Sequence, residues 1–113
     1  MKEIDNILTR NSPLELCKPC PDEAQMDLVY KAALRAPDHA WLRPSRFLQI
    51  TGDGLEKLSE IFCSYAKENI KNITKEKLEK FKKAPFRAPM IIVLISNITD
   101  HPSVPEHEQM FST

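Results

Sequence analysis

The stretch that decides the fold is MIIVLI, at positions 90–95. It is a continuous apolar run, and four of its six residues carry β-branched side chains, which favour strands. An apolar run without polar alternation is typical of a strand that is buried on both faces of a sheet. We therefore predict a strand at about positions 90–97 with other elements covering both of its faces.

One other strand is predicted, FLQIT at positions 47–51, and the segment GDG at 52–54 predicts a turn at its end. Other segments show the apolar spacing of helices, and Asp22 followed by Gln25 predicts a capping box. We predict helices over 3–9, 22–35, 55–71 and 74–83, and the beginning of another from 105. This order predicts an α+β fold with helices around a small sheet. Two strands cannot cover both faces of the second one, so further strands or a partner chain are expected.

The composition is that of an ordinary globular protein, and 113 residues suffice for one domain. Sixteen basic and sixteen acidic residues cancel, so no net field attracts nucleic acid or an anionic membrane. No window approaches the roughly 18 apolar residues of a membrane span. The first residues, MKEID, are charged and lead into no apolar signal core. We therefore expect a cytoplasmic protein with no nucleic-acid and no membrane partner.

Three short segments point beyond a generic domain: LTRNSP at 8–13, AALRAPDH at 32–39 and APFRAP at 84–89. In the first, an arginine and a hydroxyl group follow a helix end, a combination that suits a phosphate group. The second places Arg35 at a helix C-terminus and His39 in the loop behind it. Taken singly, each has a structural explanation: a capped surface turn, a favourable charge at a helix end, and a rigid entry into a strand.

In combination and order, these segments, together with LRPSRF at 42–47, resemble the nitroreductase family, most closely its compact stand-alone bacterial members. The resemblance covers essentially the whole chain, and positions 35–47 are its most specific part. It implies an α/β sandwich, a homodimer and an FMN cofactor. It also implies a ping-pong reaction in which NAD(P)H is the electron donor and a nitro-aromatic or quinone-type small molecule is the acceptor.

The resemblance also implies which residues bind the cofactor. The turn after the first helix binds the phosphate and ribityl chain of FMN in this family, which corresponds to Arg10, Asn11 and Ser12. The arginine and histidine of the second segment also contact FMN, which corresponds to Arg35 and His39. Because the cofactor carries the chemistry, no side chain is expected to act as general acid or nucleophile, and no metal is implied.

This chain departs from the family pattern at several positions. Asn11 stands where many relatives have a second arginine, Glu15 follows where a basic residue is usual, and Ser45 replaces an aromatic residue. The family also continues well beyond position 113, into segments that complete the sheet, the dimer interface and the flavin site. We therefore expect residues 1–113 to be the N-terminal portion of a single truncated domain, with impaired FMN binding and activity.

Three other functions are compatible with parts of the sequence. Cys17 and Cys20 form a C-x-x-C motif, but dithiol chemistry requires the first cysteine at a helix N-terminus after a strand, and here a turn precedes it. The same pair with His101 and His107 has spacing too wide for a typical zinc site. The third is an inactive nitroreductase remnant that acts as an interaction module through an exposed strand.

Overall fold

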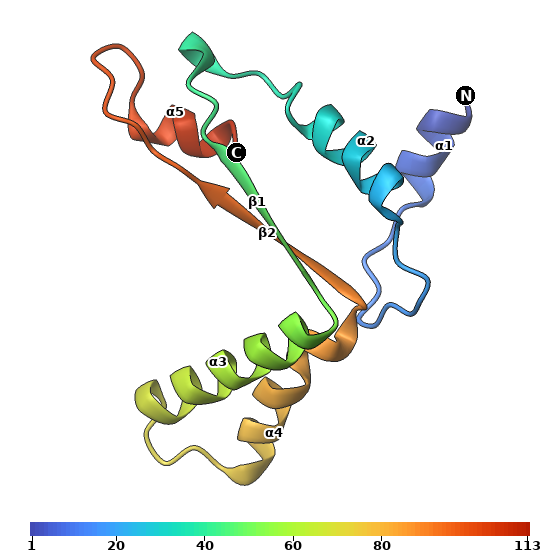
Figure 1. Cartoon of the computed structure of the whole chain (residues 1–113), viewed down its shortest axis with the longest axis vertical. Coiled ribbons are helices and arrows are strands. Elements are labelled where there is room, and N and C mark those ends of the chain that lie inside the picture. Colours follow the sequence, from blue (N-terminus) through green and yellow to red (C-terminus); the bar gives the residue numbers. More distant parts are fainter.

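The computed structural model describes all 113 residues and contains helices at both ends of one two-stranded sheet (Figure 1). The helices are α1 (Lys2–Thr9), α2 (Glu23–Ala33), α3 (Asp53–Asn69), α4 (Lys75–Lys83) and α5 (Glu106–Phe111), with the short 3-10 helices η1 (His39–Trp41) and η2 (Ala84–Arg87). The two strands are β1 (Ser45–Thr51) and β2 (Met90–Ser96). The predicted α+β class, with helices around a small sheet, is confirmed.

The sheet is a long antiparallel pair whose strands are joined by α3, α4 and η2. Its register runs from Ser45 opposite Ser96 to Thr51 opposite Met90. Both predicted strands are therefore present, and β1 begins two residues earlier than predicted. The segment between them returns to its starting point, so α3 and α4 lie together at one end of the sheet (Figure 1).

The predicted capping box starts α2. The Asp22 side chain accepts a hydrogen bond from the backbone N–H of Gln25 (2.8 Å), and the Gln25 side chain accepts one from the backbone N–H of Asp22 (2.9 Å). The helix ends at Ala33, two residues short of the prediction. Tyr30 ties the helix to β1 by donating a hydrogen bond from its hydroxyl to Gln49 (2.8 Å), and its ring lies 5.2 Å from that of Phe47.

Replacing Asp22 with Ala is expected to destabilise α2. The change removes the acceptor for the Gln25 N–H, and the loss of such a cap costs about 1 kcal/mol. Amide hydrogen exchange in the first turn of α2 should therefore become about fivefold faster. The matched control is Asp27→Ala, which removes a carboxylate of the same helix that pairs only with exposed Lys31. Equal acceleration in both variants would contradict a role for the cap.

The predicted turn at 52–54 is wrong, because α3 begins directly at Asp53. Gly52 adopts a left-handed φ of 51°, which lets the chain turn from strand to helix at a single residue. The helix packs on α4 and η2 through Ala66, which is fully buried, and through Ser59, whose hydroxyl donates to the Lys82 carbonyl (2.7 Å). None of the helices is both long and apolar enough to cross a membrane.

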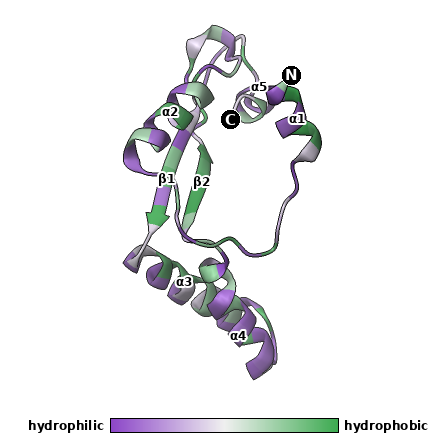
Figure 2. Ribbon diagram, turned by 90° about the vertical axis from the view of Figure 1, so that its right-hand side faces the viewer, coloured by the Kyte–Doolittle hydropathy of each residue, from purple (hydrophilic) through white to green (hydrophobic).

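The prediction that both faces of β2 are buried is also wrong. Its first four residues are half-buried and its last three are exposed, with Leu94 60% exposed. The reason is that β1 is its only strand neighbour, and that α2, which contacts β1 through Tyr30, leaves β2 largely uncovered (Figure 2). The open shape agrees with this, since the radius of gyration is 17.8 Å where a compact domain of this size has about 13 Å.

Candidate functional site

The turn that follows α1 presents a guanidinium and a hydroxyl group together. Arg10 ends the helix with an extended backbone (φ −60°, ψ 135°), which turns its side chain toward the next residues. Its Nη1 donates a hydrogen bond to the Ser12 hydroxyl (2.9 Å), and Asn11 lies between them. All three residues are exposed, so the remaining N–H groups of Arg10 are accessible to a ligand.

The loop after α2 holds the other two predicted site residues. Arg35 follows the helix end and is exposed. His39 begins η1, and its Nδ1 donates a hydrogen bond to Glu108 of α5 (2.8 Å). This contact fixes the imidazole ring against the C-terminal helix and leaves its Nε2 without a hydrogen-bond partner in the chain.

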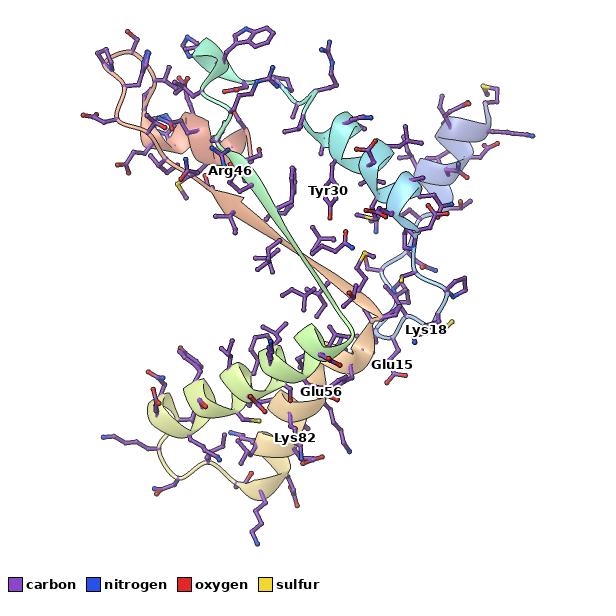
Figure 3. The ribbon with its side chains drawn as sticks, in the orientation of Figure 1. Glu15, Lys18, Tyr30, Arg46, Glu56 and Lys82 are labelled. Atoms are coloured by element: carbon purple, nitrogen blue, oxygen red, sulfur yellow. The ribbon has the colours of Figure 1, made fainter.

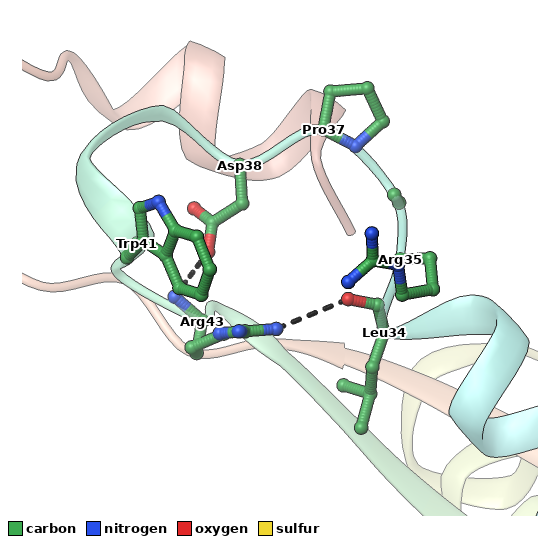
Figure 4. A pocket seen from close by; sticks show the side chains of 7 residues that line it. Leu34, Arg35, Pro37, Asp38, Trp41 and Arg43 are labelled. Carbon is green, nitrogen blue, oxygen red and sulfur yellow. Dashed lines mark hydrogen bonds between the residues drawn. The ribbon is translucent and has the colours of Figure 1, made fainter.

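A cavity of about 200 Å³ lies in this same loop (Figure 4). The backbone N–H of Arg43 donates to the Asp38 carboxylate (2.7 Å), and Arg43 Nη1 donates to the Leu34 carbonyl (3.1 Å). The same guanidinium lies over the ring of Trp41, 4.6 Å from its centre. The cavity is lined by Leu34, Arg35, Ala36, Pro37, Asp38, Trp41 and Arg43.

The backbone of this loop is strained. Ala40, Trp41 and Arg43 adopt left-handed φ values of 60°, 56° and 50°. Each such residue with a side chain costs about 1–2 kcal/mol relative to its ordinary conformation. Strain of this kind persists where surrounding contacts hold it, here the hydrogen bonds of Arg43, and it is concentrated at functional sites.

Replacing Ala40 with Gly is expected to stabilise the protein by about 1 kcal/mol. Glycine adopts the left-handed conformation without a steric penalty, which outweighs its larger entropy in the unfolded chain. Urea unfolding followed by circular dichroism should show the higher midpoint. As a control, Ala32→Gly in helical α2 should shift the midpoint in the opposite direction. A lower midpoint for the Ala40 variant would show that this residue is not strained.

Three relatives decide the family. The chain is 33% identical to "Putative NAD(P)H nitroreductase YdjA" of Escherichia coli and 34% identical to a "Putative NAD(P)H nitroreductase" of Haemophilus influenzae, over 99% of its own length in both comparisons. It is 28% identical to YfhC of Bacillus subtilis, which carries the same description, over 69% of its length. The chain belongs to the nitroreductase family. It spans about 60% of the length of the first two relatives and 40% of the third. No protein-family model matches it.

In this nitroreductase-family chain, the two groups of predicted site residues occupy separate segments. Arg10 and Ser12 contact each other, and Arg35 lies in the loop that His39 ties to α5. No hydrogen bond or ion pair joins the two groups, and Figure 1 shows α1 at the outer edge of the molecule. All five arginines of the chain lie outside its ion pairs, so their guanidinium groups have no carboxylate partner.

The cysteine pair lies outside both groups. Cys17 is exposed and Cys20 half-buried, and both are free thiols. The backbone before them is held to η2, because Leu16 N–H donates to the Arg87 carbonyl (2.7 Å). Neither cysteine lies at the start of α2, whose cap is Asp22, so the strand-to-helix setting of dithiol chemistry is missing. No group of three or more potential ligands in the chain could hold a metal ion.

The structure adds two residues that the family pattern does not assign to the site. Trp41 and Arg43 line the cavity and stack on each other. The available signal was the position of the only tryptophan of the chain, in a loop between two arginines. Nothing in the sequence predicts their left-handed backbone, because neither tryptophan nor arginine is a residue type that favours that conformation.

Proposed function

We propose that residues 1–113 form the N-terminal, phosphate-binding portion of a nitroreductase-type domain, which acts as an FMN-dependent NAD(P)H oxidoreductase. The relatives, which are named as NAD(P)H nitroreductases, support the donor and the reaction class. The observation that carries the proposal is the paired guanidinium and hydroxyl of Arg10 and Ser12, 2.9 Å apart, with no carboxylate near enough to compete.

The donor set suits a flavin phosphate. A phosphate is bound best by charge-assisted hydrogen bonds from arginine, and an arginine already paired with a carboxylate would lose much of that energy. Arg10 and Arg35 are both unpaired and exposed. Glu15, which would repel a phosphate, lies instead in a groove beside α4 (Figure 3). The charged residues that line the groove with it are Glu76, Glu79, Lys80, Lys83 and Arg87. The groove therefore holds three carboxylates and three cations, and its charges balance.

The proposed roles follow the positions. Arg10, Asn11 and Ser12 would hold the phosphate and ribityl chain, and Arg35 and His39 would contact the cofactor from the second loop. His39 is oriented for this by its bond to Glu108, which leaves Nε2 available. When bound, FMN supplies ping-pong electron transfer from NAD(P)H to a nitro-aromatic or quinone-type acceptor, and the chain binds and orients it.

The test is the visible absorption of the purified chain after incubation with excess FMN and removal of free flavin. Flavin bands at near one per chain would support the proposal, and oxidation of NADH or NADPH would be assayed next. A colourless protein that also shows no flavin fluorescence quenching in a titration would overturn it. The titration detects binding that is too weak to survive removal of free flavin.

A second candidate function is that of an interaction module. If the protein is an enzyme, the same apolar surface would form its homodimer interface. It is favoured by the exposed apolar side chains along the sheet, among them Leu48 and Leu94. The free edge of β2 contains no charge, proline or bulge, the devices that normally prevent strands from pairing between molecules. Sedimentation at increasing protein concentration tests it: a monomer throughout would remove this candidate.

A further inference from the structure

We propose that Cys17 and Cys20 are a redox-modification site, at which exchange with glutathione disulfide forms a reversible disulfide between the two residues. Both are free thiols in the loop between α1 and α2, which contains neither helix nor strand. Figure 3 shows Lys18, which lies between them in the sequence, on this loop. The reaction needs no flavin, so it goes beyond the proposed function.

A disulfide within the loop has fewer structural requirements than dithiol catalysis. Catalysis on other proteins requires a thiolate stabilised at a helix N-terminus, and neither cysteine has that position. A bond between the two cysteines requires only that their sulfur atoms can meet, with the Cα atoms about 4.4–6.8 Å apart. We therefore expect a modification of this loop without oxidoreductase activity toward other proteins.

The path of the loop allows the two sulfur atoms to meet. Three residues of fully extended chain span about 10 Å, which is too far for a disulfide, so the chain has to bend between the cysteines. It bends at Lys18. The ring of Pro19 restricts its backbone φ, which leaves the open loop fewer conformations to lose when the bond closes.

The loop is held on both sides of the cysteine pair. The Leu16 N–H donates to the Arg87 carbonyl (2.7 Å), and Arg87 Nε donates to the Leu14 carbonyl (2.9 Å). On the other side, Asp22 caps α2. Because both cysteines lie between these anchors, the bond closes within one short segment, and we expect the helices and the sheet to be unchanged by it.

The exposure of the two thiols sets the order of the exchange. Cys17 is exposed and Cys20 is half-buried, so glutathione disulfide reaches Cys17 first. The Cys17 thiolate attacks one sulfur of glutathione disulfide, whose S–S bond breaks and releases one glutathione thiolate. The Cys20 thiolate then attacks the Cys17 sulfur, which breaks the mixed disulfide and releases the second glutathione. The protein loses two electrons, glutathione disulfide gains them, and the protons of the two cysteine thiols are taken up by the two glutathiones.

The test uses the full chain, reduced and then incubated at rising ratios of glutathione disulfide to glutathione. Unreacted thiols are alkylated, and the products are identified by intact mass and peptide mapping. We expect a product in which Cys17 and Cys20 have lost their two hydrogen atoms and are linked, while Cys63 is alkylated. The link should disappear again in excess glutathione. A mixed disulfide as the end product, or a link that includes Cys63, would overturn the proposal.

Single variants identify the two steps. Cys20→Ser removes the second thiol, so the reaction should stop at a glutathione adduct on Cys17. Cys17→Ser leaves only the half-buried thiol of the loop, which should react about tenfold more slowly. The matched control Cys63→Ser should form the same disulfide as the native chain, and circular dichroism confirms that each variant is folded. Equal rates for Cys17→Ser and Cys20→Ser would contradict the order of the two steps.

Unfolding shows whether the folded loop favours the bond. In urea the anchors at Leu16 and Asp22 are lost, and the equilibrium constant for forming the disulfide should fall about tenfold. An equal or larger constant in urea would show that the folded loop does not favour the bond, and would overturn the proposal. Flavin retention tests the proposed function separately, because neither cysteine is among the residues proposed to bind FMN.

Discussion

Replacing Arg10 with Gln is expected to weaken FMN binding by about ten- to a hundredfold. A hydrogen bond to a charged group contributes about 1.5–3 kcal/mol, and each 1.4 kcal/mol corresponds to a factor of ten in affinity. Glutamine keeps most of the length and polarity of the side chain and can still approach Ser12, so the loss isolates the charge. The measurement is quenching of flavin fluorescence in a titration with the chain.

The control for this variant is Lys2→Gln, which removes one positive charge from the opposite end of the same helix. It should leave the affinity for FMN nearly unchanged, because an exposed charge at that distance is largely screened. The affinity of the native chain should also fall more steeply with salt than that of Arg10→Gln. Equal affinities of the two variants would contradict a direct contact between Arg10 and the phosphate.

Replacing Gln109 with Met is expected to produce the largest loss of local stability. Gln109 is 2% exposed, its amide donates to the carbonyls of Thr99 (2.8 Å) and Val104 (3.3 Å), and its carbonyl accepts from the Thr99 N–H (2.9 Å). Methionine fills a similar volume and satisfies none of these groups. Buried unpaired groups cost about 1–3 kcal/mol each, so we expect a loss of about 3 kcal/mol.

Amide hydrogen exchange at Thr99 measures this directly and should accelerate about a hundredfold. Two controls accompany it. Gln109→Glu places a buried carboxylate against the carbonyls of Thr99 and Val104 and should lose at least as much protection, and Glu106→Gln changes an exposed residue of the same helix and should have no effect. Unchanged exchange in Gln109→Met would mean that α5 is held by other contacts.

The local elements of this protein could be predicted from the sequence because their signals are local. The capping box of Asp22 and Gln25 and the apolar run of β2 were both identified from neighbouring residues, and both are present. The start of α3 was missed because Gly52 alone makes the turn that three residues were predicted to share. The burial of β2 was mispredicted for another reason: an apolar run indicates what a strand can bury, and its neighbours decide what covers it.

The candidate site was predictable only in part. The spacing of Arg10 and Ser12 and the loop at Arg35 and His39 were identified from a resemblance that follows sequence motifs. The stack of Trp41 on Arg43 depends on a left-handed backbone at residues that rarely adopt it. The hydrogen bond between His39 and Glu108 of α5 joins segments that lie far apart in the chain. Such features arise from tertiary contacts, which no short window of sequence contains.

The pairing of Thr51 with Met90 has a consequence for how the chain folds. The strands that meet there are separated by α3, α4 and η2, and bringing the ends of a long flexible segment together costs entropy. The two helices contact each other locally, and local contacts form early. Once they have docked, the strand ends are already neighbours, so sheet formation proceeds as the closing of a short hairpin. We therefore expect the helical pair to form first and the sheet to pair outward from it, from Thr51 toward Ser45.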